Sequence, residues 1–165
     1  MRPLLSIVIP SNNRTELLEE AINSIISDPG WGPDCELCIS DNSKSDETSM
    51  LIQTKYTSTS GIIYRRSLDT PSLDENVNMA VSMANGEYAW IFGDDDLLLP
   101  GFLSYFIDYL RTHAPDIVIL NSRSFQDGEI VEDSRLALDS PKIYGVNDND
   151  AFLADYGGYL TYVGG

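Results

Sequence analysis

The sequence predicts an α/β fold with a mostly parallel sheet flanked by helices. Short apolar runs alternate with segments of helical periodicity from the N-terminus to about residue 121. The first run, Leu4–Ile9, is nearly continuously apolar and contains β-branched residues, which is typical of a central strand covered on both faces. Strands that alternate with helices form a parallel sheet, and the connections between them are right-handed crossovers.

The first strand is expected to end at Pro10, where a polar loop begins. Asn13 is placed to cap the next helix, and Glu16 would complete a capping box at its third position. Apolar residues at helical spacing then form one stripe. They are Leu17, Leu18, Ala21, Ile22, Ile25 and Ile26.

The later elements are assigned by the same patterns, with Gly86 expected as the C-cap of the third helix and Asp127-Gly128 as a hairpin turn. In chain order we expect a strand over 36–40, a helix over 47–56, a strand over 61–65, a helix over 74–85, a strand over 87–93, a helix after Pro100-Gly101, a strand over 116–121, a hairpin over 122–133 and a short helix over 150–156.

Length and charge narrow the function. A chain of 165 residues suits one domain, which we divide into a core over 1–121 and an incomplete appendage over 122–165. The net charge of −16 argues against nucleic acid or an anionic membrane surface as partner. A nucleotide stays possible because a divalent cation can join acidic side chains to a diphosphate. With no apolar run long enough to span a bilayer and no signal-peptide core, we expect a cytoplasmic protein.

The two cysteines, Cys35 and Cys38, form a C-x-x-C pair within a predicted strand. Alternation along a strand sends their sulfur atoms to opposite faces, and a structural zinc site needs four ligands. The interpretation we favour is that both are small core residues.

Polar residues gather where the predicted strands end, over 10–13, 41–46, 65–76 and 94–96. In open parallel sheets, ligands bind outside the carboxyl ends of the strands. The sequence therefore predicts a polar ligand site at this edge. It contains neither phosphate-binding glycine motif, which argues against kinases, ATPases and dinucleotide-dependent dehydrogenases.

Three consecutive aspartates follow the strand predicted over 87–93. Alternation would turn Asp94 and Asp96 to the same side, where two carboxylates can share a hard cation such as Mg²⁺ or Mn²⁺. The alternative is a solvated turn that caps the helix beginning near Pro100.

Five segments follow one another along the chain in a recognisable order. They are Leu5-Ser6-Ile7-Val8-Ile9-Pro10-Ser11-Asn12-Asn13-Arg14, Ile39-Ser40-Asp41-Asn42-Ser43-Lys44-Ser45-Asp46, Ala84-Asn85-Gly86-Glu87-Tyr88, Gly93-Asp94-Asp95-Asp96 and Leu98-Leu99-Pro100-Gly101. Together these segments resemble family-2 glycosyltransferases, the nucleotide-sugar enzymes of the GT-A fold. The resemblance covers about residues 4–121 and is closest to the bacterial O-antigen and capsule branch of abequosyltransferase type.

The resemblance implies a nucleoside end of the donor site. Pro10, Ser11 and Asn12 would line the base and ribose. Asp41 would accept a hydrogen bond from the base, and Asn42 would shape the same loop. An aromatic residue is frequent in the family where this chain has Asn12, so a stacking contact to the base is expected to be missing.

The resemblance also implies a diphosphate end. Arg65 would approach the phosphates, and Asp74 and Asn76 match a D-x-N element near the nucleotide or donor sugar. Asp94 would contact hydroxyl groups, and Asp96, together with Asp94, would hold a divalent cation, Mn²⁺ or Mg²⁺. The remaining donor contacts expected are Arg14 and Asp95.

The function so implied is metal-assisted, inverting transfer of a sugar from a nucleotide-diphosphate donor to a glycan or lipid-linked acceptor. The cytoplasmic protein would meet that acceptor at the inner face of the membrane. The family places its catalytic base and acceptor segment well beyond the aspartates, so we expect both beyond residue 165 in a truncated chain, whose exposed apolar surface would favour a homo-oligomer. Two alternatives stay open: a non-catalytic nucleotide-binding or interaction module on the same fold, and an acidic cation-binding domain.

Overall fold

The computed structural model describes residues 2–68, 72–126, 128–134, 136 and 141–160. The chain divides into two compact units, Met1–Ala114 and Pro115–Gly165. The strand expected over 116–121 is not part of the sheet of the first unit, and the division into a core over 1–121 and an appendage over 122–165 stays a prediction.

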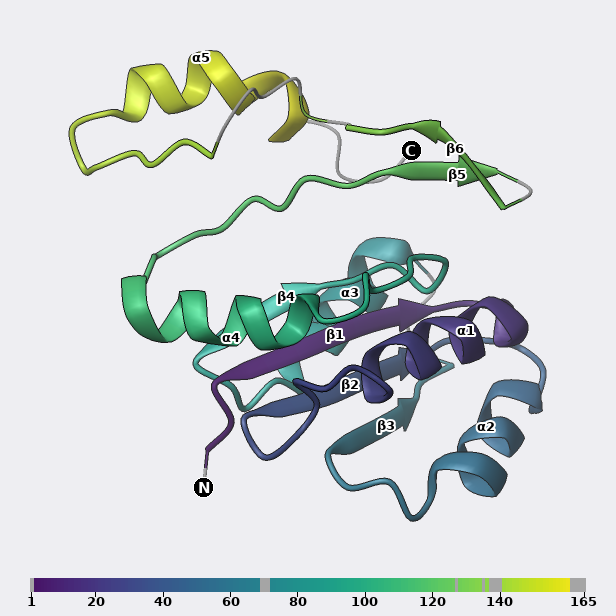
Figure 1. The fold of residues 1–165 in the computed structure, drawn as a ribbon. Coiled ribbons are helices and arrows are strands. Elements are labelled where there is room, and N and C mark those ends of the chain that lie inside the picture. Colours follow the sequence, from purple (N-terminus) through teal and green to yellow (C-terminus); the bar gives the residue numbers. More distant parts are fainter. Residues whose placement is uncertain (1, 69–71, 127, 135, 137–140, 161–165) are drawn as a thin grey trace. The chain divides into compact units, whose positions relative to one another are not determined.

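The first unit contains a four-stranded, fully parallel sheet in the order β3-β2-β1-β4, with helices on both sides (Figure 1). The predicted α/β class with a mostly parallel sheet is therefore confirmed. The strands are β1 (Leu5–Ser11), β2 (Cys35–Asp41), β3 (Ile62–Arg66) and β4 (Tyr88–Ile91).

The strand β1 continues to Ser11, so the expectation that Pro10 ends it is wrong. Its neighbour β4 pairs with β1 only as far as Val8, although Phe92 N still donates to Val8 O. Pro10 therefore lies beyond the reach of β4, where its missing N–H removes no ladder bond on that side. This extension carries Ser11 to a position opposite Asp41 of β2.

The helix α1 (Thr15–Ile26) buries the predicted stripe through Leu18, Ala21, Ile22 and Ile25. The predicted capping box is wrong, since Arg14 occupies the N-cap and no side chain caps the helix. Asn13 instead has a φ of 55° and accepts a hydrogen bond from Lys44 N through Oδ1. The asparagine links two strand-end loops, and this contact takes the place of capping.

The helix predicted over 47–56 is present as α2 (Glu47–Leu51) with a π-helical continuation, η1 (Ile52–Tyr56). The next helix, α3 (Leu73–Ser82), begins with a capping box made by Ser72 and Glu75. It ends at Ser82 and its C-cap is Met83, so Gly86 is not the C-cap. A Cβ on Gly86 would lie 2.7 Å from Ser6 N, and close approach to β1 explains the glycine.

Two helices cover opposite faces of the sheet. Ala80 of α3 packs with Val8 and Cys38. On the other side, Trp90 packs edge-on against Phe106 of α4 (Phe102–His113), which follows Gly101 as predicted. Trp90 pairs with Ile7, whose side chain points away from that of Val8.

Both cysteines are buried free thiols in β2, as predicted. Burial is the main cause that raises the pKa of Cys35 to about 11 and that of Cys38 to about 12. Thiols with such pKa values stay protonated at neutral pH and act as core residues.

The second unit contains a two-stranded antiparallel hairpin, β5 (Ser124–Gln126) and β6 (Glu129–Glu132), as predicted; Asp127 of its turn lies outside the described residues. The helix α5 (Asn149–Leu160) confirms and lengthens the helix predicted over 150–156. None of the helices in the described ranges is long and apolar enough to cross a membrane.

The strand predicted over 116–121 does not form. A strand needs a pairing neighbour, and β-propensity alone does not supply one. Asn121, the last residue of the predicted strand, instead binds a later part of the chain through its side chain: Leu136 N donates a 2.8 Å hydrogen bond to Asn121 Oδ1.

Candidate active site

The carboxyl ends of the strands bring the predicted polar residues together. Ser11 ends β1, Asp41 ends β2 and Arg66 ends β3, and Asp41 lies opposite both of the others in register. The aspartates 94–96 follow the end of β4. This arrangement matches the edge at which open parallel sheets bind ligands.

Ser11 and Asp94 form the link between the ends of β1 and β4. Ser11 Oγ donates a 2.9 Å hydrogen bond to Asp94 Oδ2, and both residues are at most 6% exposed. Arg14 Nη1 donates to Asp94 Oδ1 at 3.1 Å and to Asp95 Oδ2 at 3.0 Å. Burial raises the pKa of Asp94, and the contacts with Ser11 and Arg14 oppose that rise.

The aspartates do not alternate as the sequence suggested. The strand β4 ends at Ile91 instead of Gly93, and the chain then turns. Asp94 consequently points inward to Ser11, whereas Asp96 is exposed and its Oδ2 accepts a hydrogen bond from Gly93 N at 3.2 Å. The prediction that Asp94 and Asp96 face the same way along an extended strand is therefore wrong.

The turn instead brings carboxylate oxygens of Asp95 and Asp96 together beside Gly93. A Cβ built on this glycine would lie 2.7 Å from Asp96 Oδ2 and 3.0 Å from Asp95 Oδ1. Carboxylate oxygens suit Mg²⁺ and Mn²⁺, and Mg²⁺ is commonly held by only one or two carboxylates besides water and substrate phosphate. The residues present thus fit such a cation, although no group of three or more His, Cys, Asp or Glu residues within the described ranges is arranged to hold a metal.

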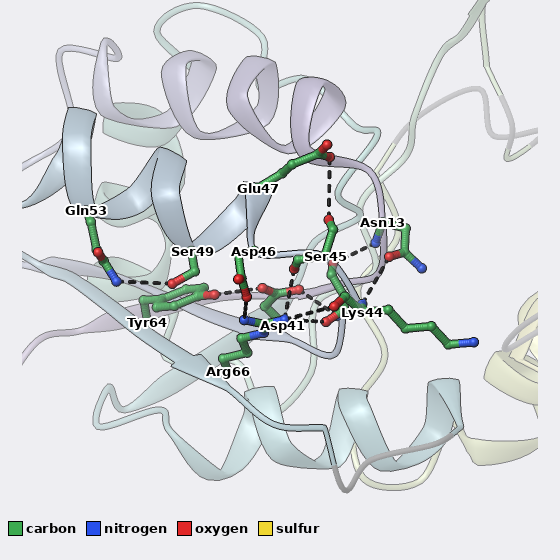
Figure 2. A network of polar contacts seen from close by, with 11 residues as sticks. Asn13, Asp41, Lys44, Ser45, Asp46, Glu47, Ser49, Gln53, Tyr64 and Arg66 are labelled. Carbon is green, nitrogen blue, oxygen red and sulfur yellow. Dashed lines mark hydrogen bonds and ion pairs between the residues drawn. The ribbon is translucent and has the colours of Figure 1, made fainter.

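Asp41 is completely buried and both of its oxygens are used. Oδ1 accepts from Ser43 N at 2.8 Å, and Oδ2 accepts from the hydroxyl of Tyr64 at 2.6 Å (Figure 2). Burial and the contact with Asp41 raise the pKa of Tyr64. The carboxylate therefore holds Tyr64 and the following loop in place.

The D-x-N element divides into a buried and an exposed residue. Asn76 is 2% exposed, donates to Ser11 O at 3.1 Å and to Asn42 Oδ1 at 3.3 Å, and accepts from Ser40 Oγ at 2.7 Å. It joins the ends of β1 and β2 from beneath the site. Asp74 is exposed at the start of α3.

The loops after β1 and β2 are also bonded to each other. Asn13 N donates to Ser43 Oγ at 2.7 Å, and Asn42 N donates to Ser11 O at 3.1 Å. Pro10 is half-buried beside them and Asn12 is exposed. The residues predicted to bind the nucleoside therefore lie at the ends of β1 and β2 and in the two loops that follow them, which are bonded to each other.

Of the two adjacent arginines, Arg65 is exposed, whereas Arg66 contacts the loop after β2. Sequence reasoning selected Arg65 and missed Arg66 and Tyr64. Residues two apart on a strand share a face, so Tyr64 and Arg66 point to the same side of β3. The signal that could have identified both is the pairing of β3 with β2, which places Arg66 opposite Asp41.

Three acidic residues near the end of the chain, Asp148, Asp150 and Asp155, lie in the second unit. Asp148 Oδ2 accepts from Gly145 N at 2.8 Å, and Asp155 Oδ2 accepts from Lys142 Nζ at 2.7 Å and from the hydroxyl of Tyr144. These hydrogen bonds lower the pKa of Asp155. Asp150 lies in the first turn of α5.

A second polar cluster lies at the opposite ends of the strands. Glu36 is buried there, and its Oε1 accepts from Ser6 Oγ and Asn85 N, both at 2.6 Å. Burial acts to raise the pKa of Glu36, but these hydrogen bonds outweigh it and lower the pKa. The donors satisfy this carboxylate within the core, so the cluster supports the fold.

Comparison with known proteins assigns the family. The family model described as Glycosyl transferase family 2 matches residues 6–152. The chain is 42% identical over 112 residues to abequosyltransferase RfbV of Salmonella typhimurium, covering 67% of this chain and 34% of that protein. It is 35% identical over 103 residues to the GalNAc(5)-diNAcBac-PP-undecaprenol beta-1,3-glucosyltransferase of Campylobacter jejuni, covering 62% of this chain and 33% of that protein.

Solved structures show the same fold. The crystal structure of S. aureus TarS 1–349 matches with a TM-score of 0.61 and 19% identity, over 67% of this chain and 33% of that one. Our chain spans about a third of the length of each of these relatives. The GT-A fold expected from the resemblance is confirmed, and the chain belongs to glycosyl transferase family 2.

Proposed function

We propose that the protein transfers a sugar, with inversion, from a nucleotide-diphosphate donor to a glycan or lipid-linked acceptor during cell-surface polysaccharide synthesis. The observation that carries the proposal is the connected set of loops at the carboxyl ends of β1, β2 and β4, with an aspartate triplet beside Ser11 and Arg14. The named relatives are glycosyltransferases, which supports the same activity.

In the proposed donor site, the region 1–121 binds the nucleotide sugar, and 122–165 begins the acceptor side. The base and ribose lie against the loops of β1 and β2. Ser11 and Asn42 are held there by each other and by Asn76, and the carboxylate of Asp41 is held by Ser43 and Tyr64. Because Asp41 is buried and each of its oxygens accepts a hydrogen bond from the protein, we propose that its loop presents backbone groups to the base. Pro10, Asn12 and Asp74 complete this side.

At the diphosphate end, we propose that Asp96 holds a divalent cation, Mn²⁺ or Mg²⁺, with help from Asp95 or Asp94. Such a cation supplies Lewis-acid stabilisation of the charge on the departing diphosphate. The side chain of Arg14 already lies against two of these carboxylates, so its guanidinium is close enough to bind phosphate oxygens as well. Arg65 is proposed as a second phosphate contact.

The relatives support a proposal for the acceptor and for the place of the reaction. The name of the Campylobacter jejuni enzyme includes GalNAc(5)-diNAcBac-PP-undecaprenol, and this supports a lipid-linked acceptor at the inner face of the membrane in the cytoplasm. Apolar side chains on the first unit, among them Ile91 and Leu99, are exposed. They support our proposal of a homo-oligomer.

Calorimetric titration with UDP, GDP, CDP and dTDP, each with Mn²⁺ and again with EDTA, tests this proposal. We expect saturable binding of one nucleotide, strengthened by the metal, because one solved relative of this fold is a complex with UDP. An Asp96→Ala variant should lose the metal dependence. Absence of binding to all four nucleotides by the folded protein would reject the proposed donor site.

A further inference from the structure

We propose that Arg66 is a positioning residue that determines base selectivity by fixing the loop 43–46, which follows β2. This inference rests on the proposed nucleotide site. Arg66 is the last residue of β3 and lies opposite Asp41 in the parallel register. It belongs to none of the motifs that carry the family resemblance.

The guanidinium of Arg66 holds every residue of this loop (Figure 2). The two N–H groups of Nη2 are shared among three successive carbonyl oxygens, which lie 3.2 Å (Ser43), 3.1 Å (Lys44) and 2.9 Å (Ser45) from Nη2. Nη1 pairs with the carboxylate of Asp46. One planar cation therefore defines the path of four consecutive residues.

The clamped loop in turn fixes the groups around the proposed base site. Ser43 N donates to Asp41, Ser43 Oγ accepts from Asn13 N, and Lys44 N donates to Asn13 Oδ1. If the loop moved, these three bonds would be lost together. The buried carboxylate of Asp41 would then lose the Ser43 amide as a donor and keep the hydroxyl of Tyr64.

Electrostatics favour the charged guanidinium in this place. The hydrogen bond to Asp46 is the main cause of the raised pKa of Arg66, with Asp41 and Tyr64 adding to it. Nε is buried and has no hydrogen-bond partner among the described residues, so the acceptors in the loop determine how the group is oriented. The side chain of a lysine has a single nitrogen and cannot reproduce the planar arrangement of several donors in a guanidinium.

The contacts of Arg66 point to the base and not to the diphosphate. The aspartates 94–96 are held by Ser11, Arg14 and Gly93, whereas the side chain of Arg66 donates to residues 43–46. Loss of the clamp should therefore affect discrimination between bases while leaving the diphosphate contacts in place. If Arg66 had a merely structural role, its loss would instead weaken the binding of all nucleotides by the same factor.

The test compares Arg66→Lys with Arg111→Lys, the same substitution at an exposed ion pair that joins α4 to Asp34. Dissociation constants for UDP, GDP, CDP and dTDP are measured with Mn²⁺ in both variants and in the unchanged protein. In Arg66→Lys we expect the ratio between the tightest nucleotide and the others to fall roughly tenfold, the factor that accompanies one lost base contact. Arg111→Lys should keep the ratio.

A second measurement needs no ligand. Amide hydrogen exchange of Asn13, Ser43 and Lys44, followed by NMR, should become faster in Arg66→Lys and stay unchanged in Arg111→Lys. Unchanged exchange, an unchanged selectivity ratio or equal weakening of all four nucleotides would each overturn the inference. Failure of the unchanged protein to bind any nucleotide would reject the proposed function itself, and with it the selectivity role; the exchange rates would still show whether Arg66 holds the loop.

Discussion

Ser11 and Asp94 are 83 positions apart in the sequence, yet Ser11 Oγ donates a 2.9 Å hydrogen bond to Asp94 Oδ2. The bond ties the last residue of β1 to the turn after β4. Arg14 contacts the other oxygen of the same carboxylate at 3.1 Å. Asp94 is thus a fixed, inward-facing member of the aspartate triplet, and Asp95 and Asp96 are the members exposed to solvent.

Replacing Ser11 by alanine should destabilise the protein. A buried hydrogen bond to a charged acceptor contributes about 1.5–3 kcal/mol, so we expect a loss of that order in the free energy of unfolding, measured by urea denaturation. Because the bond opposes the raised pKa of Asp94, that pKa should rise further and can be followed by NMR. Ser82→Ala, on the exposed side of α3, is the control and should change stability by less than about 0.5 kcal/mol.

Because its pKa is raised, the contribution of Asp94 to stability falls as the pH rises above 3.8, the ordinary value of this carboxyl. In that range the folded state binds more protons than the unfolded state, so deprotonation costs stability. Asp94→Asn removes this cost. The free energy of unfolding of the variant minus that of the unchanged protein, measured with urea, should therefore be more positive at pH 7 than at pH 4. A difference between the two proteins that does not vary with pH would contradict a raised pKa of Asp94.

Removal of the Tyr64 hydroxyl should leave a buried oxygen of Asp41 without its donor. We expect Tyr64→Phe to lower the free energy of unfolding by about 1–3 kcal/mol, the usual cost of an unsatisfied buried group. Tyr105→Phe, at a position that is 64% exposed, is the matched control. Equal stabilities of the two variants would show that the contact contributes nothing.

Two substitutions should change cation affinity in opposite directions. Arg14→Gln removes the positive charge beside Asp94 and Asp95, so Mn²⁺ should bind roughly two- to fivefold more tightly without nucleotide, as expected for a partly exposed ion pair. Gly93→Ala places a methyl group against the oxygens of Asp95 and Asp96 and should weaken Mn²⁺ binding. Both are measured by electron paramagnetic resonance of free Mn²⁺. Weaker binding in Arg14→Gln would mean that the guanidinium organises the site.

The order of strands and helices could be predicted from sequence because each apolar run and helical stripe is local. The edge of the sheet that carries polar residues followed from topology alone. Local rules failed where a distant partner decides the conformation. Asn13 bonds to Lys44 instead of capping α1, and Gly86 packs on Ser6 instead of ending α3.

The candidate site shows the same limit. The identity of the aspartates was evident, but their orientation depends on the turn after Ile91 and on Ser11, which no local pattern reveals. Asp41 was expected to meet a base directly, and its burial beneath Tyr64 became visible only when β2 and β3 were aligned. The pairing of strands also decides which of the two arginines contacts the loop after β2.

The most direct test of a donor site at this edge is amide hydrogen exchange of the whole chain with and without the tightest-binding nucleoside diphosphate and Mn²⁺. The account predicts slower exchange on binding in three segments, 11–14, 41–46 and 92–96, and no change around Glu36 at the opposite ends of the strands. Protection centred on Glu36 and Asn85, or protection of none of the three segments, would contradict it.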